Sequence, residues 1–385
     1  MATAAVTFKN FFCGVDPAFP DQVYTNRLAV GPWERVRYVW TTQGTVTVVF
    51  DAANRVLSIT PDGQFETRPA GTNGPWEQFT VSGNYLISAH GVVLEAEMLW
   101  RPAMPLNLVG TQLKDPWNRD VFLKLATAFL AYQMWLDGEL DDLDEVLDQL
   151  QQMGCNGIVV FGMCFYIPIH EYQERAFDPD NYGDRYFEEL PKFAKMLLGR
   201  GMYLYWCSFA DAQIIMPGNA AQVTFHNRVV AAFAPSKNVL YRLANEPTVH
   251  SFNYVDPALF AKPTTMLACS GDRPANYSTV PAHTWDFGDL HVDRDETKGI
   301  LDCCPADNPI YKAGKGLIQG EPCRYGSNGS PGNLPPSHAR KAACAARAGA
   351  MGITFHSRNG VRTELIDAVT MPFAQAMFAD AFGPV

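Results

Sequence analysis

The sequence lacks the features that would assign it to several broad classes of protein. Its 385 residues include 30 Lys and Arg against 40 Asp and Glu, so the formal net charge is −10. Contacts to phosphate groups need a basic surface, and this balance argues against a nucleic-acid partner. No stretch approaches ~18 consecutive apolar residues, the length that a membrane-spanning helix requires. We therefore expect neither a nucleic-acid partner nor a membrane span.

The motifs of several enzyme classes are also missing. Residues 1–7 contain neither a basic n-region nor an apolar h-region, so no signal peptide is predicted. The 8 His residues are scattered, and there is no His-Glu-x-x-His motif, no Gly-x-Ser-x-Gly motif and no phosphate-binding glycine loop. One short segment alternates acidic residues with a His, which is more typical of a polar strand face than of a metal site. Its members are Asp289, His291, Asp293 and Asp295. We expect neither a metal nor another cofactor.

The cysteines do not form a recognisable disulfide framework. Their number, 9, is odd, and no Cys-x-x-Cys occurs. Four of them lie in or beside apolar runs and are predicted to be buried thiols, namely Cys155, Cys164, Cys207 and Cys269. Pairing among Cys303, Cys304 and Cys323 stays open, because sequence alone does not determine it.

The sequence contains two parts with different patterns. Residues 1–105 consist of short β-rich runs, and Gly31-Pro32-Trp33-Glu34 recurs as Gly74-Pro75-Trp76-Glu77. A period near 43 residues indicates a repeated β-hairpin unit. Pro102, Pro105 and Pro116 lie within a short span, and we interpret residues 106–120 as a linker.

Residues 121–385 alternate apolar strand-like runs with amphipathic helices, the pattern of a parallel α/β barrel. Between residues 137 and 150, for example, Leu140, Leu143, Leu147 and Leu150 form one apolar stripe. Eight strands are predicted at 125–132, 156–163, 201–207, 238–244, 264–270, 285–292, 315–321 and 353–355, with a possible bulge at Gly288 and a closing helix over 364–382. The predicted fold class is a (β/α)8 barrel preceded by a small all-β domain.

Two glutamates end predicted strands of this barrel. The fourth strand runs into Asn245-Glu246-Pro247, and the seventh ends at Glu321-Pro322. Barrel enzymes place their chemistry at the carboxyl ends of the strands. Two carboxyl groups at one pocket are what glycoside hydrolysis requires, since one protonates the leaving oxygen and the other attacks or activates water.

Aromatic residues follow several of the predicted strands and could stack against sugar rings. Those that we single out are Tyr132, Trp135, Trp206 and Tyr325. Packing is the better explanation for any single one of them. Together at one rim they favour a carbohydrate ligand.

The Asn-Glu-Pro and Glu-Pro strand ends resemble those of the retaining (β/α)8-barrel glycoside hydrolases over residues 120–385. The resemblance implies that Glu246 is the acid/base and Glu321 the nucleophile, while Asn245 binds the sugar 2-hydroxyl. It also implies that His291, on strand six, hydrogen-bonds Glu321 or the sugar. Two positions depart from the family pattern. His356 stands on strand eight where many members have a Trp platform, and strand two has no Arg.

Residues 1–105 resemble a fascin-like β-trefoil whose third copy lacks Gly-Pro-Trp-Glu. Such a module can bind glycans or proteins, or serve as a docking spacer. Its fusion to a glycosidase-like barrel is similar to proteins of tailed-bacteriophage virions, which need no signal peptide; otherwise a cytoplasmic protein is expected. Two functions follow. One is a retaining glycosidase acting on a cell-surface or envelope polysaccharide. The other is a non-catalytic virion structural or receptor-binding protein that contacts glycans or other virion proteins.

Overall fold

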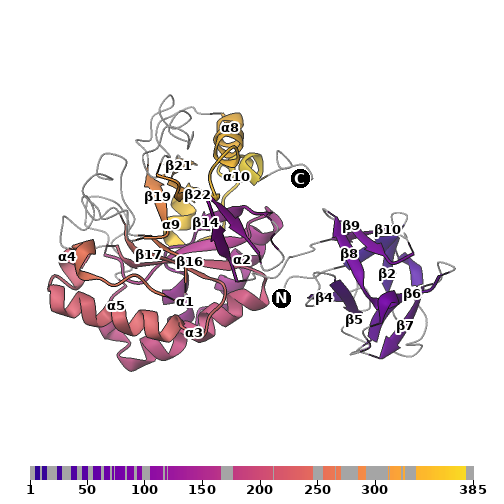
Figure 1. Cartoon of the computed structure of the whole chain (residues 1–385), viewed down its shortest axis with the longest axis horizontal. Coiled ribbons are helices and arrows are strands. Elements are labelled where there is room, and N and C mark those ends of the chain that lie inside the picture. The colour runs from indigo at the N-terminus through magenta and orange to yellow at the C-terminus, as the bar shows by residue number, and fades with distance from the viewer. Residues whose placement is uncertain are drawn as a thin grey trace. The chain divides into compact units, whose positions relative to one another are not determined.

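The computed structural model describes the greater part of the chain. The described residues are 5–8, 11–14, 24–27, 36–40, 46–50, 55–61, 65–69, 72, 74–82, 85–90, 93–97, 105–115, 118, 120–165, 177–210, 212–245, 255–264, 266–269, 285–291, 311, 313–321, 324–325 and 335–378. The chain divides into two compact units, Met1–Pro102 with Pro384–Val385, and Ala103–Gly383 (Figure 1).

The first unit is an antiparallel β-structure, which confirms the prediction of a small all-β region. Its strands are β1 (Ala5–Phe8), β2 (Phe11–Gly14), β3 (Tyr24–Arg27), β4 (Val36–Trp40), β5 (Val46–Phe50), β6 (Arg55–Ile59), β7 (Phe65–Pro69), β8 (Phe79–Ser82), β9 (Tyr85–Ser88) and β10 (Val93–Glu97). They pair in the order β3-β2-β1-β10-β9-β8-β5-β6-β7, and β4 also pairs with β5. Residues such as Phe50, Leu57 and Phe79 are fully buried and form its core.

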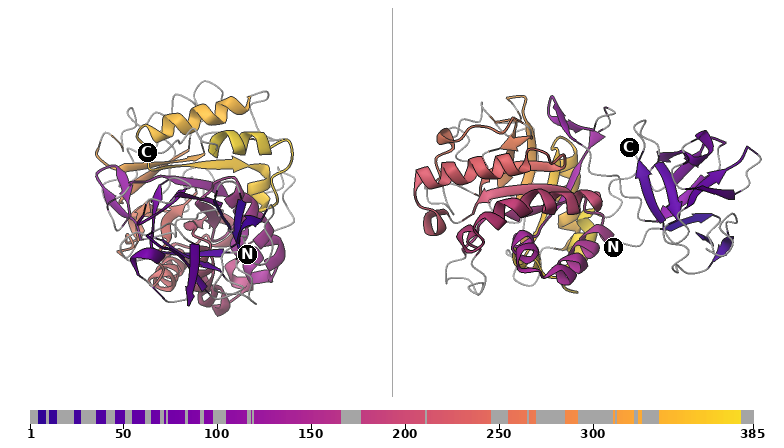
Figure 2. Two further views of the ribbon diagram at one scale, coloured as in Figure 1. Left: turned by 90° about the vertical axis from the view of Figure 1, so that its right-hand side faces the viewer. Right: turned by 90° about the horizontal axis from the view of Figure 1, so that it is seen from below.

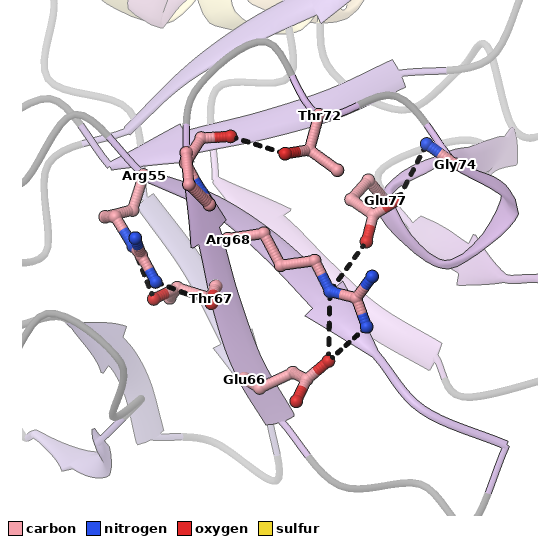
Figure 3. Close-up of polar contacts among 8 residues, drawn as sticks. Arg55, Glu66, Thr67, Arg68, Thr72, Gly74 and Glu77 are labelled. Atoms are coloured by element: carbon pink, nitrogen blue, oxygen red, sulfur yellow. Dashed lines mark hydrogen bonds and ion pairs between the residues drawn. The ribbon is translucent and has the colours of Figure 1, made fainter.

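The second Gly-Pro-Trp-Glu copy forms a capped turn, the 3-10 helix Pro75–Glu77 (Figure 3). The buried Glu77 carboxylate accepts the backbone N–H of Gly74 at 2.8 Å. A Cβ on Gly74 would lie 2.7 Å from that carboxylate, so a larger residue at the first position of the motif would have to displace the Glu77 side chain. The Arg68 guanidinium lies 3.5 Å from Glu77 and 4.9 Å from the centroid of the Trp76 ring. The motif residues therefore hold one another in place.

The second unit begins with a three-stranded antiparallel sheet and continues as a parallel barrel. The small sheet consists of β11 (Asn107–Val109), β12 (Gln112–Lys114) and β13 (Asp120–Val121). The barrel strands are β14 (Leu123–Thr127), β15 (Gly157–Phe161), β16 (Tyr203–Phe209), β17 (Val239–Ala244), β18 (Ala268–Cys269), β19 (Phe287–His291), β20 (Gly316–Glu321) and β22 (Gly352–Ser357), with β21 (Arg324–Tyr325) beside β22. They pair in the order β18-β17-β16-β15-β14-β22-β20-β19. The Asp286 N–H donates to the Ala268 carbonyl at 2.9 Å and joins the two ends, so the predicted (β/α)8 barrel is confirmed.

Helices cover the outside of the strands (Figure 1). They are α1 (Ala131–Asp137), α2 (Leu140–Gln152), α3 (Asp184–Gly199), α4 (Ala212–Ile215), α5 (Asn219–Phe233), α8 (Pro336–Arg347), α9 (Arg358–Arg362) and α10 (Met371–Phe378), with 3-10 turns at Pro179–Asn181 and Pro257–Leu259. α3 lies beside α5, and α8 beside α10; Figure 2 shows the second pair as neighbouring yellow helices. The predicted stripe of α2 is buried at Leu143, Leu147 and Leu150, whereas Leu140 is 45% exposed.

Several predicted element boundaries were wrong. The first strand was expected over 125–132, but β14 ends at Thr127 and α1 begins at Ala131. Because the strand end and the first helical turn are both buried, their residues form one apolar run in which periodicity gives no boundary. The strand irregularity lies between Leu290 and His291 and not at Gly288. The closing helix begins only at Met371.

The four cysteines predicted to be buried thiols are free and buried, as expected. A fifth, Cys344 on α8, is free and exposed. Within the described ranges, none of the helices combines the length and the apolar character needed to cross a membrane.

Candidate functional site

Three of the predicted site residues lie at the carboxyl ends of barrel strands. Asn245 directly follows β17, His291 ends β19, and Glu321 ends β20 opposite His291 in the strand register. Parallel strands of a barrel end at one face, so these positions share the same end of the barrel. Glu246 and the side chain of Glu321 lie outside the described residues.

Asn245 is held by its backbone and buried, with 7% of its surface exposed. Its N–H donates to the carbonyl of Phe209 at 2.8 Å, which continues the pairing of β16 and β17 by one residue. Its side-chain oxygen Oδ1 has no hydrogen-bond partner among the described residues. Because buried polar atoms are nearly always paired, this amide is suited to receive a polar ligand group.

A buried cluster of polar side chains lies inside the barrel near the same end. Arg242 on β17 donates from Nη1 to Asp289 Oδ2 at 2.5 Å and to His291 Nε2 at 2.8 Å. All three residues are at most 3% exposed. The cluster therefore links strand four to strand six close to the carboxyl ends of both strands.

The charge of Arg242 is balanced by Asp289. Burial by itself would raise the pKa of Asp289, but the adjacent Arg242 guanidinium together with His291 overcomes this effect and keeps the pKa below its usual value. Arg242 also lies 5.4 Å from the centroid of the Tyr205 ring, and the Tyr205 hydroxyl is 3.1 Å from the sulfur of Cys269. Burial raises the pKa of Tyr205, so its phenol is neutral. Arg242 and Asp289 are thus a compensated ion pair in the interior of the barrel.

Gly320 leaves the space that this cluster occupies. A Cβ at this position would lie 2.0 Å from Asp289 Oδ1 and 2.8 Å from His291 Nε2. Gly320 immediately precedes Glu321 on β20, so strand seven packs closely against the cluster. Any larger residue would have to displace Asp289, His291 or the strand that carries Glu321.

Three aromatic residues predicted to line the rim lie elsewhere. Tyr132 and Trp135 belong to α1, and Trp206 lies on the outer side of β16. Tyr132 is fully buried, and its ring centroid lies 5.2 Å from that of Tyr186 and 5.3 Å from that of Trp206. Trp135 donates to Glu189 on α3 at 3.1 Å. These side chains join the helices to the barrel and do not form a sugar platform.

Trp206 begins a chain of hydrogen bonds behind the strands. Its Nε1–H donates to Ser208 at 3.1 Å, and the Ser208 and Tyr241 hydroxyls are 2.5 Å apart. Tyr241 is 2.9 Å from His226 Nδ1, while His226 Nε2 is 3.0 Å from the Ala261 carbonyl. A carbonyl only accepts, so Nε2 carries the hydrogen and Nδ1 accepts from Tyr241. Each polar group in the chain is satisfied.

The remaining predicted residues lie on the last strands. His356, on β22, is 1% exposed and its ring centroid lies 5.6 Å from that of Phe129. It is therefore an interior residue of strand eight. Tyr325 lies on β21, opposite Ser357, and its side chain is outside the described part of the chain.

Arg242 was missed by the sequence reasoning, although a signal for it exists. It is the only charged residue of Val239–Ala244, a strand whose residues are all buried. A charge within a fully buried strand requires a partner, because an isolated buried charge is costly. Asp289 was considered only as part of an alternating acidic face. The described residues contain no group of His, Cys, Asp and Glu that could hold a metal ion.

Fold and site together define an eight-stranded parallel barrel with buried polar residues at the carboxyl ends of its strands. No protein-family model and no curated protein matches the sequence. Among solved structures the chain is similar to a variant of GH5_18 from Streptomyces cattleya in complex with Manb1-4GlcNAc, at 13% identity over 68% of this chain and 80% of that one, with a TM-score of 0.46.

Two further structures are similar to the chain. A glycoside hydrolase family 5 mannosidase from Rhizomucor miehei is 11% identical over 73% of this chain and 98% of that one, with a TM-score of 0.46. An exo-beta-1,4-mannosidase from Opitutaceae bacterium strain TAV5 is 14% identical over 72% and 63%, with a TM-score of 0.45. At these identities the likeness concerns the fold alone.

Proposed function

We propose that the protein is a retaining glycoside hydrolase that acts on a cell-surface or envelope polysaccharide. The observation that carries the proposal is the position of Asn245 and Glu321 at the carboxyl ends of strands four and seven of one barrel. Glu246 follows Asn245 directly in the sequence, which supports a place for its carboxyl group at the same end of the barrel.

In this mechanism the two glutamates have different tasks. Glu246 protonates the glycosidic oxygen, and Glu321 attacks the anomeric carbon to form a glycosyl-enzyme intermediate. Glu246 then removes a proton from the water that hydrolyses this intermediate. Asn245 orients the sugar through its buried amide, and His291 lies opposite Glu321 to hold that carboxylate or the sugar.

The test is hydrolysis of a panel of aryl β-glycosides and soluble β-linked polysaccharides, β-mannan among them. Glu321→Gln should abolish turnover, because the amide is not a nucleophile. Glu246→Gln should lower kcat by about 10²- to 10⁴-fold, the usual contribution of a general acid. Glu188→Gln on the exposed side of α3 is the matched control and should keep full activity.

A 2-deoxy-2-fluoro glycoside with a good leaving group tests the covalent step. It should add one glycosyl group to Glu321 in the wild type, which peptide mass spectrometry detects. Unchanged turnover by the Glu321→Gln variant would refute the assignment of the nucleophile.

A non-catalytic adhesion protein is the second candidate, and one observation favours it. Strand two, Gly157–Phe161, is entirely buried and carries no charged residue that could face the nucleophile. If this function is correct, the wild type binds the glycan without cleaving it, and the glutamine variants bind equally well.

We propose in addition that the first unit is a fascin-like β-trefoil and that the protein belongs to a phage tail. The antiparallel all-β architecture of that unit supports the first statement. The combination of such a module with a glycosidase-like barrel supports the second. Antibodies against the barrel should label the tails of purified virions, and labelling absent from intact and disrupted particles would contradict the assignment.

A further inference from the structure

The contact between Arg242 and His291 determines the form of the histidine. The Arg242 guanidinium carries only donors, so His291 Nε2, at 2.8 Å, must accept. Asp289 Oδ2 is 3.5 Å from the same nitrogen, at the outer limit of a hydrogen bond, so the Arg242 contact at 2.8 Å is the dominant one. A ring whose Nε2 accepts is neutral and carries its hydrogen on Nδ1.

Three independent features fix this arrangement. Asp289 orients Arg242 by accepting from the same Nη1 at 2.5 Å. Gly320 lies against Asp289 and His291 at a distance that admits no Cβ. The cluster is also almost completely buried, so water cannot replace the Arg242 donor. The titratable groups that surround Arg242 from neighbouring strands are Tyr205, Cys207 and Cys269.

We propose that Arg242 is a positioning residue that holds His291 as a neutral Nδ1–H tautomer at the carboxyl end of strand six. With Nε2 engaged inside the barrel, the Nδ1–H is the donor that His291 presents. Because His291 lies opposite Glu321 in the strand register, the tautomer determines whether the end of strand six offers a hydrogen-bond donor or an acceptor there. The consequence for catalysis rests on the glycosidase function proposed above.

The direct test is a long-range ¹H–¹⁵N spectrum of the full-length protein labelled at histidine nitrogens. Comparison with His291→Gln identifies the His291 signals among those of the 8 histidines. At neutral pH the wild type should show a protonated Nδ1 and an unprotonated Nε2. A protonated Nε2, or a doubly protonated ring, would overturn the proposal without any further variant.

The double variant Arg242→Met with Asp289→Leu tests the role of Arg242. Both charges leave together, so no unpaired charge remains in the core. We expect His291 to change to the Nε2–H tautomer and kcat/KM to fall on the order of 10²-fold, the cost of misplaced active-site groups. An unchanged tautomer would refute positioning by Arg242.

The matched control removes an exposed pair of the same type. Arg228 and Asp184 lie 2.6 Å apart at the surface, with 46% and 82% of their side chains exposed. Arg228→Met with Asp184→Leu should change neither the tautomer nor the rate. A wild type that hydrolyses no glycoside but shows the Nδ1–H tautomer refutes the proposed function alone. Hydrolysis together with an Nε2–H tautomer refutes the positioning role alone.

Discussion

The hydrogen-bond chain behind strands three and four leads to a quantitative prediction. In Tyr241→Phe the ring remains and no cavity forms, but the hydroxyl between Ser208 and His226 is lost. Ser208 loses a neighbour and His226 Nδ1 loses its donor, and all three residues are at most 1% exposed. Each buried polar group left without a partner costs about 1–3 kcal/mol. Ser208 keeps the hydrogen bond from Trp206, so His226 Nδ1 is the group left without a partner, and the variant should lose about 1–3 kcal/mol of unfolding free energy.

The assay is urea unfolding followed by circular dichroism and by tryptophan fluorescence. The denaturation midpoint should fall while the m-value stays constant, because the surface exposed on unfolding is unchanged. Tyr182→Phe is the control, since its hydroxyl donates to Asp137 at 2.8 Å at the exposed surface. It should lose no more than about 1 kcal/mol, the net value of an ordinary hydrogen bond.

A double-mutant cycle with Ser208→Ala separates the pair from the rest of the chain. Residues in one hydrogen-bond network usually show a coupling energy of about 0.5–3 kcal/mol. A destabilisation by Tyr241→Phe no larger than that of Tyr182→Phe would refute the reasoning. It would mean that the buried hydroxyl contributes no more than an exposed one.

Three other predictions concern stability. Burial lowers the pKa of His226 in the folded protein, so below the pKa of ~6.5 in the unfolded chain protonation favours the unfolded state. The unfolding free energy should therefore fall as the pH is lowered from about 7.5 to about 5.5, and it should fall by less in His226→Gln. Gly352→Ala should lower the unfolding free energy by about 1–3 kcal/mol through overpacking, because its Cβ would lie 2.6 Å from Leu123. Gly199→Ala is the control in the same urea assay; its Cβ would have nothing within 4 Å, and the variant should be as stable as the wild type or more stable. Glu77→Ala should lower the melting temperature of the first unit by leaving the Gly74 N–H without its cap, at a cost of about 1–3 kcal/mol; an unchanged calorimetric transition would contradict this role.

The sequence by itself determined the barrel and the order of its strands. Apolar runs alternate with amphipathic segments such as Leu140–Gln152, and this periodicity reflects burial on both faces of a parallel sheet. It also placed Asn245 and Glu321 at strand ends, because a polar residue can end a buried run but rarely interrupts it. Both properties depend on the order of apolar and polar residues within one short segment, so they can be seen in the sequence without knowing which segments are in contact.

Only the tertiary structure decided which side chains meet. Tyr132 and Trp206 are aromatic residues of the kind that stack against sugars, but in the structure they pack against each other. Whether an aromatic side chain faces a ligand or the protein core depends on the elements that pack against its strand or helix. Arg242 and Asp289 are 47 residues apart, and no local pattern relates them. Their pairing depends on the register of strands four and six and on the space left by Gly320, which are properties of the closed barrel.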